Sequence, residues 1–298
     1  MTGPKSYIAQ MSQSAPQAEI PQDTYPVARI SSEYFLRGID LLTRLQDHTL
    51  ISGLIFVALW QGQMVTTKRR PVGVRELARQ LRMPYETVRR HAATLVAAGQ
   101  CVATPKGIAV RSAALRRQSN VDFLHGIYLN SERMLIDLTR AGLAKFHPSR
   151  VRTQGRAPLT HEQTAIAIAA MGQLLAGARL VGDLWKGDLL RGLVYTAIWT
   201  ANVKHVTNTA PAATRAVLPD EQRLPISALA ISNSLRLPYE TVRRHVNGLL
   251  KDGFCLSGSR GGLVVPASTH RKLAGTTVEI LRIVTGVLLE MRRAGVRV

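Results

Sequence analysis

The stretch "LRMPYETVRRH" (81–91) returns with one substitution as "LRLPYETVRRH" (235–245). The match extends without a gap over residues 71–101 and 225–255, in which 14 of 31 positions are identical. We call these two segments the first copy and the second copy. Because a solenoid needs about three or more repeats to bury its stacked faces, two copies indicate one unit that has been duplicated.

Weaker matches flank both copies in the same order. Upstream, "LISGLIFVALW" (50–60) pairs with "LLRGLVYTAIW" (189–199), and downstream "MLIDLTRAGL" (134–143) pairs with "VLLEMRRAGV" (287–296). The polar, Pro-containing stretch at 146–162 is typical of a linker. We therefore predict a disordered N-terminal arm at 1–29, a first domain at 30–145, this linker, and a second domain at 163–298.

The charge of the chain indicates a polyanionic partner. Its 298 residues include 39 basic and 19 acidic side chains, which gives a formal net charge of +20. The excess is +9 in residues 1–149 and +11 in residues 150–298, so neither half is neutral. Such a surplus favours nucleic acid over a membrane surface, although charge alone also serves solubility.

Cysteine content and hydropathy indicate a reducing compartment and no membrane span. Two cysteines are too few for a disulfide scaffold or a four-thiolate zinc site. The N-terminal residues lack the basic and apolar regions of a secretion signal. The most apolar long stretch, 164–182, is interrupted by Gln173 and Arg179, which favours a buried packing helix over a transmembrane one. We expect a cytoplasmic protein without a membrane partner.

Each copy has the pattern of two helices joined by a tight turn and followed by a hairpin. In the first copy an amphipathic segment at 74–81 stops before Pro84, because a residue that precedes proline avoids helical angles. Pro84 suits the start of a second helix at 85–99. Alternating residues at 100–112 predict a small hairpin, and 254–266 is its counterpart. The expected fold is mainly α with small β-wings.

This order resembles the winged helix-turn-helix domain of bacterial transcriptional regulators. Ala78, Arg82 and Val88 match the helix-turn-helix spacing, and "YETVRRH" is similar to the second-helix segment of the catabolite-activator type. Each half also resembles a subunit of the multiple-antibiotic-resistance-regulator (MarR) family, with two helices before the motif and a long one after it. In the second copy Ser232 stands at the position of Ala78. The resemblance implies a single-chain pseudo-dimer of two winged domains, whose shared scaffold would be helices within 34–64, 114–145, 164–199 and 270–295.

A recognition helix places its N-terminal turns against base edges in the major groove. Arginine can bind both guanine acceptors and glutamate can accept from the cytosine amino group, so Glu86 with Arg90 could read a G·C step. The alternatives are a helix-dipole role for Glu86 and a solvated face for the arginines. The outward residues are retained between the copies as strictly as the inward valine, which favours DNA contact. The predicted DNA-binding residues are Tyr85, Glu86, Thr87, Arg89, Arg90, Tyr239, Glu240, Thr241, Arg243 and Arg244, with Lys106 and Arg260 in the hairpin turns.

Three further pairs of equivalent residues receive structural interpretations. We expect partly buried, hydrogen-bonded side chains for the two histidines, small buried side chains for the two cysteines, and core packing for the two tryptophans. The alternatives are DNA contact or pH sensing for the histidines, redox sensing for the cysteines, and the lining of an effector pocket for the tryptophans. These pairs are His91 and His245, Cys101 and Cys255, and Trp60 and Trp199.

The sequence has no phosphate-binding glycine loop, no HExxH and no cysteine-histidine cluster, so we expect no catalysis, no metal and no cofactor. The function indicated is that of a transcriptional regulator that binds double-stranded DNA at two near-identical half-sites. A plasmid-type replication initiator and a nucleoid-associated protein are the alternatives. The sequence leaves open the target site, repression or activation, inverted or direct half-sites, a small-molecule effector and further homodimerisation.

Overall fold

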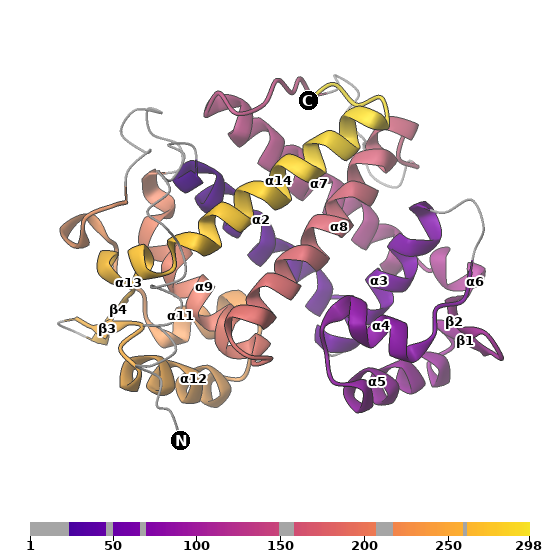
Figure 1. The fold of residues 1–298 in the computed structure, drawn as a ribbon, viewed down its shortest axis with the longest axis horizontal. Helices are drawn as coiled ribbons and strands as arrows, with labels where there is room; N and C mark the ends of the chain where they lie inside the picture. The colour runs from indigo at the N-terminus through magenta and orange to yellow at the C-terminus, as the bar shows by residue number, and fades with distance from the viewer. Residues whose placement is uncertain (1–23, 46–49, 66–69, 149–157, 207–216, 259–260) are drawn as a thin grey trace. The chain divides into compact units, whose positions relative to one another are not determined.

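The computed structural model describes residues 24–45, 50–65, 70–148, 158–206, 217–258 and 261–298 (Figure 1). These residues are mostly helical, and their strands form two small antiparallel sheets of two strands each. This confirms the predicted class, mainly α with small β-hairpins. The chain divides into two compact units, and each unit contains one copy of the repeat.

The first-copy unit consists of residues 37–136, 145–187 and 286–298. The apolar helix α3 is its centre, and it packs against α4, α5, β2 and α8. Cys101 pairs with Val110 in the antiparallel hairpin, which fixes the register of β1 and β2. The elements that lie wholly in this unit are α3 (Leu50–Val65), α4 (Val74–Leu81), α5 (Tyr85–Ala97), β1 (Cys101–Thr104), β2 (Gly107–Val110), α6 (Ser112–Leu115) and α8 (His161–Leu184).

The second-copy unit consists of residues 1–36, 137–144 and 188–285. Helix α9 has the place that α3 has in the other unit, because it packs against α11, α12 and β4. The hairpin is shorter, with Leu256 opposite Val264. Its elements are α9 (Leu189–Val203), η1 (Lys204–Val206), η2 (Asp220–Gln222), α11 (Ala228–Leu235), α12 (Tyr239–Lys251), β3 (Leu256–Ser257), β4 (Leu263–Val264) and α13 (Ala267–Lys272).

Three long helices contribute residues to both units: α2 (Thr24–Thr43), α7 (Gln118–Arg140) and α14 (Ala274–Arg293). Helix α2 starts inside the predicted arm at 1–29, because Val27 and Ala28 are buried and extend the apolar face of the helix. Residues 1–23 lie outside the described residues, as do 149–157 of the predicted linker.

Helix α8 is the one helix of the described residues that is long and apolar enough to cross a membrane, and half of its most apolar window is buried inside the fold. Ala167, Ala170 and Met171 are fully buried, and α8 packs against α3. The amide of Gln173, which interrupts the apolar run, donates to the Met134 sulfur at 3.2 Å. These contacts are those of a packing helix, as the sequence predicts for 164–182.

The equivalent tryptophans and cysteines are core residues. Trp60 packs edge-on against Phe56, with 5.8 Å between ring centroids, and Trp199 is also buried. Both cysteines are fully buried free thiols. Burial raises the pKa of Cys101 to about 12 and that of Cys255 to about 11. Because the thiolate is the reactive form, both thiols are inert near neutral pH, in accordance with the predicted packing role.

Candidate nucleic-acid interface

The turn between the two helices has the same geometry in both copies. Arg82 and Arg236 each end the first helix with a φ of 52°, in the left-handed region that residues other than glycine seldom adopt. The backbone N–H of the next residue then bonds to a carbonyl five residues back, from Met83 to Ala78 at 3.0 Å. In the second copy the hydroxyl of Ser232 adds a 2.7 Å bond to the Leu237 carbonyl. The exchange of Ala78 for Ser232 therefore adds one side-chain hydrogen bond to the turn.

The second helix of each copy begins directly after a proline, as predicted. Pro84 and Pro238 stand immediately before the first turns of α5 and α12, because the fixed proline φ and the missing N–H suit that place. The inward stripe of each helix is fully or almost fully buried. It consists of Val88, Ala92 and Leu95 in α5, and of Val242, Val246 and Leu249 in α12.

The predicted DNA-binding face of each helix is exposed to solvent. Tyr85 and Tyr239 expose 42% and 44% of their surface. The two threonines are half-buried, because they lie at the edge of the face. A shallow, open hollow of about 390 Å³ is lined by Glu86, Thr87, Arg89, Arg90 and Ala93.

The glutamate of each face is paired with the first of the two arginines. Arg89 Nε donates to Glu86 at 2.8 Å, and Arg243 Nε donates to Glu240 at 2.9 Å. The hydrogen bond and the carboxylate charge raise the pKa of both guanidinium groups. The structure therefore joins Glu86 to Arg89, whereas the sequence suggested Glu86 with Arg90 as the reading pair.

The second arginine of each face extends into solvent. Within the described residues, neither Arg90 nor Arg244 makes a side-chain hydrogen bond or ion pair, and both are exposed. A guanidinium group in this state presents its full fork of N–H donors to a ligand. Of the two arginines on each predicted face, Arg90 and Arg244 are therefore the ones whose donors are available to a ligand.

The hairpin turn of the first copy presents Lys106 to solvent, and Thr104 accepts the Lys106 backbone N–H at 3.2 Å. An isolated antiparallel β-bridge joins Val72 to Ile108 of β2. In the second copy an equivalent bridge joins Ile226 to Leu263 of β4. Glycine at position 107 lets the Val72 backbone lie this close to the hairpin, because a Cβ atom at Gly107 would be 2.4 Å from the Val72 carbonyl oxygen. The predicted wing residue Arg260 lies outside the described residues.

The two histidines are partly buried, as predicted, but their partners differ. His91 Nδ1 is hydrogen-bonded to the buried Ser52 hydroxyl of α3 at 2.9 Å. His245 Nδ1 lies 3.8 Å from the Asp188 carboxylate. Desolvation lowers the pKa of both rings. The Asp188 carboxylate partly opposes this effect at His245, while the neighbouring Arg90 and Arg244 add to it. The predicted hydrogen bond is confirmed for His91 but not for His245, whose buried Nε2 has no hydrogen-bond partner among the described residues.

A buried amide that the sequence analysis missed holds the second-copy hairpin. Asn202 of α9 donates to the carbonyls of Leu224 and Leu263 at 2.7 and 3.0 Å and accepts the Val265 N–H at 2.9 Å. Its equivalent in α3 is Gln63, three residues after Trp60. The amide of Gln63 is buried and has no hydrogen-bond partner among the described residues. The shared spacing from tryptophan was the available signal.

Ion pairs also join the helix-turn-helix segment of each copy to the rest of its own unit. Arg82, at the turn, pairs with Asp183 of α8 at 2.6 Å. In the second-copy unit, Arg191 of α9 pairs with Asp252 at the end of α12 and donates to the Gly248 carbonyl at 3.3 Å. The two copies thus share their outward faces but are anchored by different residues.

No cluster of three or more metal-ligating side chains occurs in the part of the chain that the structure describes. Comparison of the chain with protein-family models, with curated proteins and with solved structures returned no match.

Proposed function

We propose that the chain is a sequence-specific regulator that binds double-stranded DNA through two winged helix-turn-helix heads. The first-copy head is α4, α5, β1 and β2, and the second-copy head is α11, α12, β3 and β4. The observation that carries the proposal is the identity of the exposed faces of α5 and α12, from tyrosine to the second arginine, on a chain with a net charge of +20. Buried packing alone gives no reason for keeping exposed side chains identical.

In this proposal α5 and α12 are recognition helices that enter the major groove. Arg90 and Arg244 would each bind the two acceptors of a guanine, and the Glu–Arg pair beside them would meet the neighbouring base pair. Tyrosine and threonine hydroxyls at the helix start would hold phosphates. Lys106 would add a phosphate contact from the wing, independent of base sequence.

The duplication would make the chain a pseudo-dimer, with the two heads on a shared helical scaffold. Identical reading faces imply near-identical half-sites. A pseudo-two-fold relation would give inverted half-sites about one helical turn apart, whereas a translation would give direct repeats. The site of action would be cytoplasmic DNA.

Selection of bound duplexes from a random pool tests the proposal. We expect one enriched motif that contains two similar half-sites. Arg90→Ala with Arg244→Ala should cost about 1–3 kcal/mol per lost bidentate contact on the selected duplex, and much less on random DNA.

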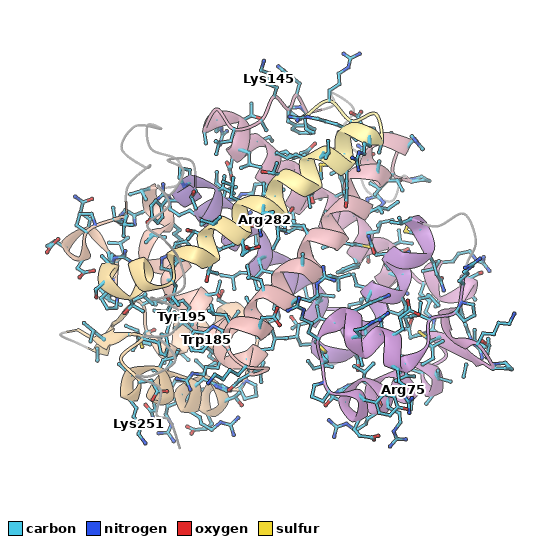
Figure 2. The ribbon with its side chains drawn as sticks, viewed as in Figure 1. Arg75, Lys145, Trp185, Tyr195, Lys251 and Arg282 are labelled. Atoms are coloured by element: carbon cyan, nitrogen blue, oxygen red, sulfur yellow. The ribbon has the colours of Figure 1, made fainter. Side chains whose placement is uncertain are left out.

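The matched control is Arg140→Ala with Arg282→Ala, which removes the same charge from two exposed arginines outside the heads. Figure 2 labels Arg282. The control should bind both duplexes with an unchanged preference. Equal losses on selected and random DNA in the Arg90 and Arg244 variant would contradict the recognition-helix assignment. Strong binding without any enriched motif would favour a nucleoid-associated protein instead.

A further inference from the structure

The two heads share the first seven residues of the recognition helix, from the tyrosine to the histidine, but differ on the helix before it. In the first-copy head α4 exposes Arg75 and Arg79. The equivalent residues of α11 are Leu229 and Asn233, and Leu229 exposes 58% of its surface. One head thus presents two guanidinium groups at the place where the other presents an alkyl group and a neutral amide.

The Arg75 side chain lies at the start of the recognition helix. Its guanidinium carbon is 5.9 Å from the centroid of the Tyr85 ring, and Tyr85 is the first residue of α5 (Figure 2). Stacking over the ring positions the cation without neutralising it. Arg75 is therefore held beside the end of α5 that, in the proposed function, faces the bases.

Arg79 follows Arg75 by one helical turn, so both side chains project from the same side of α4. The carboxylate between them, Glu76, accepts a 3.1 Å hydrogen bond from Gln80. Within the described residues neither arginine forms an ion pair. Both positive charges are available to an external anion.

In helix-turn-helix proteins the helix before the recognition helix crosses the phosphate backbone. Exposed side chains of α4 would therefore meet phosphates, and arginine forms the strongest hydrogen bonds to phosphate oxygens. Leu229 and Asn233 of α11 bring no positive charge to the same place. The difference between α4 and α11 concerns backbone contact, because the base-reading residues from the tyrosine to the second arginine are the same in both heads.

We infer, on the basis of the proposed function, that the two heads hold the duplex unequally. The first-copy head anchors the chain through phosphate contacts of Arg75 and Arg79, and the second-copy head reads an equivalent half-site without this anchor. The part of the salt dependence that comes from the helix before the recognition helix therefore lies on the first-copy half-site.

The test is the affinity of the full chain for the selected duplex between 50 and 200 mM salt. Each phosphate contact contributes about 0.9 to the slope of log affinity against log salt concentration, so Arg75→Ala with Arg79→Ala should lower the slope by about 1.8. The loss of affinity across this salt range should then be about twelvefold smaller than in the wild type.

Two variants of α11 complete the comparison. Leu229→Ala with Asn233→Ala, the matched control, should leave the slope unchanged. Leu229→Arg with Asn233→Arg should raise the slope by about 1.8, because it recreates the α4 pattern in the second-copy head. All four positions are exposed, so circular dichroism and thermal unfolding should be close to wild type.

The outcomes separate this inference from the proposed function. An unchanged slope after loss of Arg75 and Arg79 would overturn the anchor, while a retained preference for the selected duplex would leave the recognition helices in place. An equal fall in slope in the Leu229 and Asn233 control would overturn the inequality of the heads. A wild-type chain that binds selected and random duplexes equally would overturn the proposed function itself.

Discussion

Glu86 accepts a 2.8 Å hydrogen bond from Arg89 within the exposed face of α5, and Glu240 and Arg243 repeat this contact in α12. The pairing fixes the guanidinium group of the first arginine and leaves Arg90 and Arg244 extended. A carboxylate at this place also lowers the local positive charge. In the proposed function the pair therefore adds to the selectivity that the extended arginine provides.

Glu86→Gln with Glu240→Gln should reduce the preference for the selected duplex. The amide loses the charge and one of the two acceptor oxygens, so its bond to a cytosine amino group is weaker and its pairing with the adjacent arginine is lost, while the lower negative charge strengthens binding to any phosphate backbone. The measurement is the ratio of dissociation constants for selected and random duplexes. Glu279→Gln is the control, because Glu279 forms the same i,i+3 pair with Arg282 outside the heads. An unchanged ratio would leave these glutamates with a helix-dipole role alone.

Protonation of the two histidines should destabilise the fold at low pH. Their pKa values are lowered in the folded state, mainly by desolvation, so the unfolded chain binds more protons as the pH falls below its ordinary histidine value of 6.5. The stability that the neutral rings provide is present above about pH 6.5 and is lost below it. Urea denaturation at pH 5 and pH 8 gives the unfolding free energy at each pH. The difference between these two free energies should be smaller for His91→Gln with His245→Gln than for the wild type. His161→Gln, at the exposed start of α8, should keep the wild-type difference.

The equivalent buried amides Asn202 and Gln63 should respond in opposite ways to apolar replacement. Asn202→Leu leaves the buried Val265 N–H and two carbonyls without their side-chain partner, and we expect it to cost about 2–4 kcal/mol of unfolding free energy. Gln63→Met removes an amide without a partner among the described residues, so it should be within about 1 kcal/mol of the wild type or more stable. Urea denaturation measures both. Equal losses would contradict the assignment of the three Asn202 bonds.

A fragment of residues 1–145 should not fold cooperatively. It contains α3 but lacks α8, which covers α3 in the first-copy unit, and so it exposes apolar surface that the full chain buries. Thermal unfolding followed by circular dichroism should show a broad transition or aggregation. Coexpression with residues 146–298 should restore the sharp transition of the full chain. A cooperative transition of the fragment alone would contradict the role of α8 in this core.

Local features of the fold could be predicted from the sequence. The helices at 74–81 and from Tyr85 onward agree with the structure, because proline and the apolar period act over a few neighbouring residues. The burial of Val88 and the exposure of Arg90 follow from the same period. The left-handed turn at Arg82 gives no such local signal, since the residue type does not favour it.

The sequence by itself determined the two copies, their helix-turn-helix-hairpin order and the residues of their outward faces, because each depends on short-range patterns. Only the tertiary structure decided that α8 completes the first-copy unit, that Asn202 holds a hairpin while Gln63 does not, and that Arg82 pairs with Asp183. These contacts join residues that lie far apart in the chain. Their geometry depends on how whole helices pack, which no local pattern of residues specifies.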